Sequence, residues 1–367
     1  MTDVGDGDAG DAQERFMRRA LRLAKRAAGR TSPNPMVGAV IVAGDEIVGE
    51  GFHRAAGEPH AEINALRAAG ERARGATLYL TLEPCSHRGR TPPCVDAVIG
   101  AGIARVVAAL RDPYPKVNGR GFRALRQAGI RVDEGMLADE AARLNEGFLT
   151  RMRSGRPFVL LKLATTIDGR AAVAGRRYLS GKRALREVHA LRDRLDAVLV
   201  GIGTILADDP ALTVREQRGR DPLRVVVDTE GRTPTTSKIV RSPDPQRTVI
   251  FVAREADPRR TNRLRGAGVS LVRLPRTADG LDLRAVLKWL GDQGVNSVLA
   301  EGGPRIAGSL LGAGLVDKVL FLVAPVIGGD GPTALKRLAA ASGLRDVKVR
   351  RLGQDIAISA YLARSDG

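Results

Sequence analysis

The chain has little of several features that mark common protein classes. Its 367 residues include two cysteines, one tryptophan and 3% aromatic residues. No stretch approaches the roughly 18 consecutive apolar residues of a membrane-spanning helix. Two cysteines do not support a disulfide-rich secreted scaffold, and residues 1–14 lack the basic and apolar regions of a secretory signal. We therefore expect a cytoplasmic protein without a membrane partner.

Charge of one sign is in excess. The 59 Lys and Arg residues outnumber 41 Asp and Glu, which gives a formal charge of +18. This excess alone would favour a nucleic-acid partner. However, the basic residues are scattered along the chain, and too few aromatic side chains are present to stack on the bases of a single strand. A bias toward arginine explains the charge equally well and also attracts small phosphorylated ligands, so no nucleic-acid partner is expected.

The length predicts two domains, since 367 residues exceed one ordinary core. Residues 1–12 are predicted to form a mobile tail. Strands and helices alternate over residues 13–150, which is typical of an α/β layer. A basic linker is expected at 151–156, and a second α/β domain at 157–367.

The expected elements follow from hydrophobic periodicity. Helices are predicted over residues 16–28, 60–69, 94–99, 121–128, 138–149, 183–195, 258–266, 283–290 and 305–311. Strands are predicted over residues 36–42, 46–52, 77–82, 105–110, 130–133, 158–166, 197–200, 223–228, 248–253, 269–274, 297–300, 318–326 and 356–362.

A three-part pattern in the first hundred residues contains residue types that bind metal and transfer protons. It consists of His60-Ala61-Glu62, Pro84-Cys85 and Cys94. A hydrolytic zinc site uses three protein ligands and leaves a fourth position for water, which the metal acidifies. One histidine and two cysteines supply such ligands. Zinc nucleobase deaminases show H-x-E followed by P-C-x-x-C, with the glutamate as acid and base, although here the cysteines are nine positions apart.

Other interpretations of these residues are open at this point. The cysteines can be inert buried side chains, or the zinc can be structural, with His53 or His87 as a fourth ligand. A helix that begins at His60 places the histidine and Glu62 in its first turn. A helix that begins at Cys94 directs its free N–H groups at a thiolate, which favours a three-ligand site.

The second half contains glycine-rich turns. Glu301-Gly302-Gly303-Pro304 follows an expected strand and opens a helix, which suits phosphate binding but also an ordinary turn. It does not match G-x-G-x-x-G, so a Rossmann nicotinamide site is not supported. The segments 168–169, 201–204 and 208–210 are typical of turns or helix caps. None of them specifies a reaction by itself.

Taken together, these segments resemble the bifunctional deaminase/reductase family of riboflavin biosynthesis. The resemblance rests on TSPNPMVG at 31–38, PHAE at 59–62, TLEPCSHRGRTPPC at 81–94, residues 112–121 and 162–170, ADDPALTVR at 207–215 and EGGP at 301–304. It spans roughly residues 13–363, and the family shows the same long spacing between the cysteines. The resemblance implies a cytidine-deaminase-like three-layer domain followed by a dihydrofolate-reductase-like α/β domain.

The resemblance implies two reactions on a small phosphorylated pyrimidine. The first is zinc-dependent hydrolytic deamination of 2,5-diamino-6-(5-phosphoribosylamino)pyrimidin-4(3H)-one. His60, Cys85 and Cys94 would hold the zinc, and Glu62 would move a proton from water to the leaving amine. The second is NADPH-dependent reduction of the ribosyl group to ribityl, and the choice of NADPH over NADH rests on the resemblance alone. The sequence leaves a homo-oligomer open.

The family pattern also implies the residues that contact each ligand. Those matched to NADPH are Ala164, Tyr178, Thr204, Asp208, Thr229, Gly303, Pro304, Arg305, Ile306, Ala307, Gly308 and Ser309. Those matched to the substrate in the reductase are Arg176, Arg192, Leu212, Arg215 and Glu301. Arg192 and Arg215 suit phosphate binding through forked hydrogen bonds, and Asp208 suits a polarising or proton-donating role. Candidate substrate contacts in the deaminase are Asn34, His53, Arg88 and Arg90.

Two positions depart from the family pattern. Arg176-Arg177-Tyr178 stands where Ser-x-Trp is usual, and Tyr114 stands where Asn is usual. One alternative is therefore a monofunctional pyrimidine deaminase with a degenerate reductase domain. Another is a nucleic-acid-editing zinc deaminase, for which the short C-x-x-C spacing would be typical.

Overall fold

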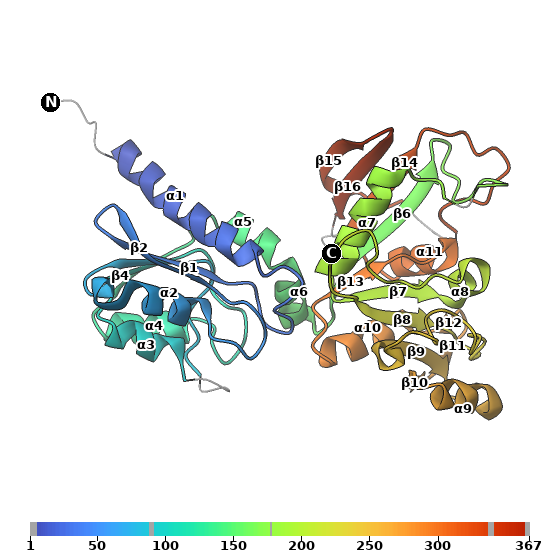
Figure 1. Ribbon diagram of the computed structural model, residues 1–367, viewed down its shortest axis with the longest axis horizontal. Helices are drawn as coiled ribbons and strands as arrows, with labels where there is room; N and C mark the ends of the chain where they lie inside the picture. Colours follow the sequence, from blue (N-terminus) through green and yellow to red (C-terminus); the bar gives the residue numbers. More distant parts are fainter. Residues whose placement is uncertain (1–5, 88–91, 177, 337–340, 364–367) are drawn as a thin grey trace. The chain divides into compact units, whose positions relative to one another are not determined.

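The chain forms two compact units, Met1–Ser154 and Gly155–Gly367, each built around its own sheet (Figure 1). The structure, a computed structural model, describes residues 6–87, 92–176, 178–336 and 341–363, with the backbone alone for 6–12. Within these ranges, none of the helices combines the length and the apolar character needed to cross a membrane.

The first unit has a five-stranded sheet in the order β2-β1-β3-β4-β5. Its strands are β1 (Gly38–Ala43), β2 (Glu46–Phe52), β3 (Thr77–Leu80), β4 (Arg105–Ala108) and β5 (Arg131–Glu134). Its helices are α1 (Asp6–Lys25), α2 (Ala61–Ala69), the 3-10 turn η1 (Gly70–Ala73), α3 (Cys94–Gly100), α4 (Arg120–Gln127), α5 (Ala138–Leu144) and α6 (Glu146–Ser154). Strand β1 is antiparallel to β2 and β3, whereas β3, β4 and β5 are parallel.

Successive side chains of β1 point to opposite faces of the sheet and pack into two separate cores. Ala39 and Ile41 belong to the core shared with α2, α3 and α4, and Val40 and Val42 to the core shared with α1 and α5. Figure 1 shows the two helical layers on opposite faces of the sheet. The first unit is therefore the predicted three-layer sandwich.

The first helix is longer than expected. It begins at Asp6, whereas the sequence predicted a start at Phe16 and a mobile tail over residues 1–12. Residues 6–12 of that tail are helical.

The helix predicted over residues 138–149 is two helices, α5 and α6. Asn145 separates them, and its side chain is bound to the backbone of Met36, with Met36 N–H donating to Oδ1 at 2.8 Å and Nδ2 donating to Met36 O at 2.9 Å. This pairing turns the chain between the helices. Helix α6 then runs to Ser154, so the linker expected at 151–156 is partly helical.

The second unit has a nine-stranded sheet in the order β10-β9-β8-β7-β13-β6-β14-β16-β15. Its strands are β6 (Phe158–Thr166), β7 (Ala197–Gly201), β8 (Leu223–Val227), β9 (Thr248–Ala253), β10 (Ser270–Leu274), β13 (Ser297–Ala300), β14 (Lys318–Ala324), β15 (Leu344–Leu352) and β16 (Asp355–Leu362), with a small hairpin of β11 (Arg276–Thr277) and β12 (Gly280–Leu281). Its helices are α7 (Lys182–Arg194), α8 (Ile202–Asp208), the 3-10 turn η2 (Pro245–Arg247), α9 (Pro258–Gly266), α10 (Leu283–Asp292) and α11 (Pro304–Gly312).

The strands from β10 to β14 in this order are parallel, and β16 is antiparallel to both of its neighbours, β14 and β15. Parallel strands place their carboxyl ends along one edge, where ligands bind in open α/β sheets. Residues implied for the reductase lie at or just beyond these ends. Thr204 follows β7, Thr229 follows β8, and Glu301 follows β13 directly.

Candidate active sites

The three predicted zinc ligands meet in the first unit. Their ligand atoms all lie within 4.8 Å of one another. His60 Nδ1 is 3.1 Å from Cys94 Sγ and 3.6 Å from Cys85 Sγ. His60 is the residue before α2, Cys85 lies on the loop after β3, and Cys94 begins α3. One imidazole nitrogen and two sulfurs at this spacing fit a tetrahedral zinc ion with one open position.

Hydrogen bonds stabilise negative charge on Cys85. The Cys94 N–H, at the start of α3, donates to Cys85 Sγ at 3.3 Å. The hydrogen bond with the Cys94 thiol lowers the pKa of Cys85 to about 4, and the same bond raises the pKa of Cys94. The hydrogen bond with Cys85 also raises the pKa of His60. Thiolate is the form of cysteine that binds metal, and the lowered pKa keeps Cys85 in this form at neutral pH.

Glu62 lies in the first turn of α2 with 3% of its surface exposed. Burial raises the pKa of this carboxyl to about 6. Such a value suits a group that both takes up and releases a proton near neutral pH. Gly51 of β2 lets α2 approach closely, because a Cβ at this position would lie 2.3 Å from Ala61 O. The sheet thus fixes the turn that carries both His60 and Glu62.

Asn34 and His53 lie beside the predicted metal ligands. The rings of His53 and His60 meet edge to face, with their centroids 5.2 Å apart. His53 Nδ1 lies 3.3 Å from Pro59 O and must donate to it, so Nε2 accepts from Asn34 Nδ2 at 3.0 Å. Burial lowers the pKa of His53, which keeps the ring neutral. The histidine therefore holds the Asn34 amide in one orientation.

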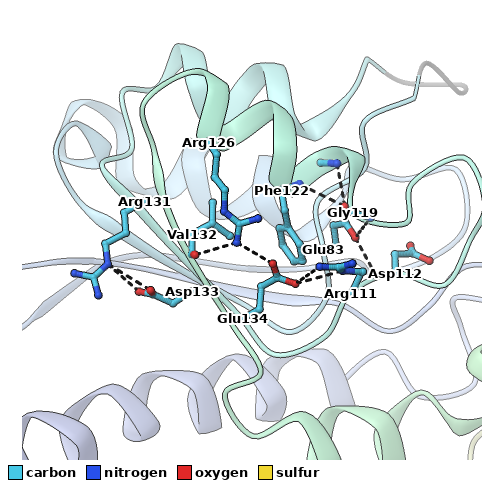
Figure 2. A network of polar contacts seen from close by, with 11 residues as sticks. Glu83, Arg111, Asp112, Gly119, Phe122, Arg126, Arg131, Val132, Asp133 and Glu134 are labelled. Carbon is cyan, nitrogen blue, oxygen red and sulfur yellow. Dashed lines mark hydrogen bonds and ion pairs between the residues drawn. The ribbon is translucent and has the colours of Figure 1, made fainter.

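Glu83 orders the loop between β4 and α4, a role that the sequence did not reveal (Figure 2). Its side chain is buried two positions before Cys85. The carboxylate accepts hydrogen bonds from the backbone N–H groups of Asp112 at 3.2 Å, Gly119 at 2.9 Å, Gly121 at 2.9 Å and Phe122 at 3.4 Å. The loop and the metal-binding segment are therefore joined through one negative charge.

We expect Glu83→Gln to destabilise the first unit by about 3 kcal/mol, because an amide cannot match a carboxylate as acceptor for several N–H groups. Calorimetry on the full chain should show this loss as a lower unfolding temperature of the first unit. The fluorescence of Trp289, the only tryptophan, reports the second unit and should not change. Glu71→Gln, at an exposed position of the same unit without an ion pair among the described residues, serves as the control and should change stability by less than about 0.5 kcal/mol. Equal stability of both variants would contradict this role of Glu83.

In the second unit, Glu301 is the centre of a buried charge cluster. Arg192 donates from Nε to Oε1 at 2.7 Å and from Nη2 to Oε2 at 3.1 Å, and Lys162 Nζ lies 3.2 Å from Oε2. Burial opposes the charge on Glu301, but Lys162 and Arg192 outweigh it and lower the pKa of the carboxyl to about 2. The cluster is therefore a fixed, ionised group at the carboxyl end of β13.

The two arginines expected to bind phosphate are placed differently. Arg192 is buried against Glu301 and also donates to Thr213 O at 3.1 Å, next to the buried Leu212. The side chain of Arg215 is exposed. Lys162 was not among the predicted site residues. It is the only charged residue in the apolar strand β6, and that contrast could have revealed it.

Some of the residues matched to NADPH lie close together at the carboxyl edge of the sheet. A Cβ on Gly303 would lie 3.8 Å from Thr204 Oγ1, which places the start of α11 beside α8. Arg176, Tyr178 and Asp208 are exposed, and their approach to ligands stays a prediction. The predicted substrate contacts Arg88 and Arg90, and Arg177 of the segment that departs from the family pattern, lie outside the described ranges.

Three residues of the type that binds zinc meet on a three-layer sandwich, and a largely parallel sheet with a charged carboxyl edge follows. This combination is typical of a zinc-dependent deaminase joined to a reductase domain. Two family models agree with this class. The cytidine and deoxycytidylate deaminase zinc-binding region matches residues 11–110, and the RibD C-terminal domain matches residues 157–358.

Whole proteins with the same architecture are similar to this chain. The riboflavin biosynthesis protein RibD of Escherichia coli (strain K12) is 44% identical, over 94% of this chain and 98% of its own. RibD of Aquifex aeolicus is 40% identical, over 95% and 98%. The structure of Acinetobacter baumannii RibD, form 1, superposes with a TM-score of 0.87 at 37% identity, covering 97% of this chain and 100% of its own.

The chain therefore belongs to the RibD family of bifunctional riboflavin-biosynthesis enzymes. This confirms the predicted fold class and the predicted pairing of a zinc deaminase with a reductase, over both alternatives.

Proposed function

We propose that residues 13–150 deaminate 2,5-diamino-6-(5-phosphoribosylamino)pyrimidin-4(3H)-one and that residues 157–367 reduce the ribosyl group of the product with NADPH. The observation that carries this proposal is the convergence of His60, Cys85 and Cys94 beside the buried Glu62. A Thermotoga maritima structure described as a diaminohydroxyphosphoribosylaminopyrimidine deaminase/5-amino-6-(5-phosphoribosylamino)uracil reductase supports the substrate. It is 35% identical, with a TM-score of 0.85, and covers 97% of this chain.

In the deaminase, the histidine and the two cysteines would hold zinc, which supplies an acidified water at neutral pH when bound. Glu62 takes a proton from the attacking water and passes it to the leaving amine. The water oxygen forms a bond to the ring carbon, the carbon–nitrogen bond breaks, and ammonia leaves. The Asn34 amide, oriented by His53, contacts the pyrimidine.

In the reductase, NADPH supplies the hydride when bound. Glu301, with Arg192 and Lys162, forms a rigid polar wall for the substrate at the carboxyl edge of the sheet. Arg215 presents an exposed guanidinium to the substrate phosphate. Asp208, at the end of α8, supplies the proton that accompanies the hydride.

Mass spectrometry of the products tests both steps on the full chain. Without NADPH, the substrate should lose its amine and gain a carbonyl oxygen. With NADPH, the product should gain two further hydrogens. Deamination that never proceeds to reduction would contradict the reductase half, and no change in either condition with zinc bound would contradict the whole proposal.

We expect Cys94→Ala to lower zinc content and to reduce deamination to less than about one hundredth, because two ligands hold zinc poorly. Reduction of the already deaminated substrate should persist, since it takes place in the other unit. Elemental analysis and the two separate assays measure these effects. Asp96→Asn, an exposed change on the same helix, should leave zinc and both activities unchanged.

Neither of the two cysteines, both within the described ranges, forms a disulfide, which suits a reducing compartment, so a cytoplasmic location is part of the proposal.

A further inference from the structure

A pocket of about 370 Å³ lies at the outer part of the carboxyl edge in the second unit. The turn after β8 and the helix α9 form it. Its lining residues are Gly231, Arg232, Thr233, Pro234, Thr235, Thr236, Arg260, Arg263 and Leu264. Three arginines and three threonine side chains thus line one cavity, and none of the lining residues is acidic.

The wall of this pocket is rigid. Asp228, completely buried, accepts hydrogen bonds through Oδ2 from Thr233 N–H and from Thr233 Oγ1, both at 2.7 Å, and its carbonyl accepts from Gly231 N–H at 3.0 Å. Gly231 has a φ of +65°, and a Cβ there would lie 3.4 Å from Thr261 Cγ2 and 3.7 Å from Arg260 Cβ. The turn therefore packs directly on α9, and the arginines are brought together by the fold.

The positive charge in the pocket is largely uncompensated. Arg260 lies 3.8 Å from Asp257, and both side chains are nearly half exposed, so that pair is weak. Across the described part of the chain, no acidic side chain forms an ion pair with Arg232 or Arg263. Guanidinium groups with free N–H donors bind phosphate through forked hydrogen bonds.

The place of the pocket along the sheet suggests which phosphate it binds. The order of neighbouring strands is β9-β8-β7-β13-β6, and the Glu301 cluster lies at β13 and β6. The cofactor must bring its nicotinamide end to that cluster, so its adenosine end extends toward β8 and β9. Thr229, matched to the cofactor, lies two residues before the pocket begins at Gly231.

We propose that Arg232, Arg260 and Arg263 bind the phosphate on the 2′-oxygen of the cofactor's adenosine ribose. This inference rests on the proposed reductase function and deepens it, because that phosphate is the group by which NADPH differs from NADH. The residues come from two segments about thirty positions apart, which explains why no motif for them is visible in the sequence.

Calorimetric titration of the full chain with adenosine 2′,5′-bisphosphate and with 5′-AMP tests the proposal. The wild type should prefer the bisphosphate by about a hundredfold, at about tenfold for each of the two arginines without an acidic partner among the described residues, Arg232 and Arg263. The double variant Arg232→Ala and Arg263→Ala should lose most of this preference and keep its weak affinity for 5′-AMP. Arg259→Ala removes the same charge from α9 outside the pocket and should keep the preference.

Equal affinity of the wild type for the two nucleotides, or a preference that survives in the double variant, would overturn the proposal. The product assay separates this failure from failure of the reductase function. Reduction with equal KM for NADPH and NADH would support the reductase function and contradict the role of the pocket in binding the 2′-phosphate. No reduction with either cofactor and no binding of either nucleotide would contradict both the reductase function and the role of the pocket.

Discussion

Replacement of Glu62 by glutamine is expected to lower kcat for deamination by about a thousandfold while zinc stays bound. Glutamine has the same size and fits the same buried turn, but it cannot take up a proton. General acid–base groups contribute about 10²- to 10⁴-fold to rate, and in the proposed mechanism Glu62 acts in both directions, first as base and then as acid. The rate of ammonia release from the diaminopyrimidinone measures the effect.

Two controls make this result specific to proton transfer. Zinc content must match the wild type, because glutamate is the proton carrier in such sites and not a ligand. Glu71→Gln, at an exposed position close to the end of α2, should retain full activity. A kcat within tenfold of the wild type, with zinc bound, would show that Glu62 does not carry the proton.

The metal-site candidates could be predicted from sequence because they are few and lie close together along the chain. The only two cysteines and a histidine–glutamate pair fall within 35 residues. Elements with strong apolar patterns could also be predicted, and β6 and β9 have the predicted bounds. The spacing of residues along the chain was therefore enough to predict the features that depend on residues close together in sequence.

Other features depend on tertiary contacts and left weaker signals. Strand β15 was not predicted, because eight of its nine residues are exposed and only Val347 and Val349 alternate with charged residues in it. Helix α8 is seven residues long and contains a glycine, which lowers its helical propensity. The role of Glu83 depends on backbone N–H groups that lie 29 to 39 positions away, and no side-chain pattern reports them.

The second large effect is expected at Glu301. Its replacement by alanine leaves Lys162 and Arg192 as neighbouring buried cations without their shared anion. Removal of one partner from a buried ion pair typically costs about 3–5 kcal/mol. Unfolding by denaturant, followed by the fluorescence of Trp289 in the same unit, should show this loss. Glu255→Ala, an exposed change in the second unit, should leave the transition in place.

The pH dependence of this stabilisation follows from the lowered pKa of Glu301. Its value is about 2 in the folded protein against an ordinary 4.5, so the carboxylate stabilises the fold fully above pH 4.5. The contribution is lost as the pH falls toward 2. The difference in stability between the wild type and Glu301→Ala should therefore be constant near neutral pH and shrink below pH 4.5.

Activity separates a substrate-binding role of Glu301 from a purely structural one. Glu301→Gln keeps the volume and one acceptor oxygen, so it should destabilise less than alanine. If Glu301 contacts the substrate, this variant should still raise KM for the deaminated intermediate under conditions where Trp289 fluorescence shows a folded second unit. Deamination should stay at the wild-type rate, because the zinc ligands belong to the first unit. Wild-type kinetics of reduction in folded Glu301→Gln would restrict the cluster to holding β13, α7 and β6 together.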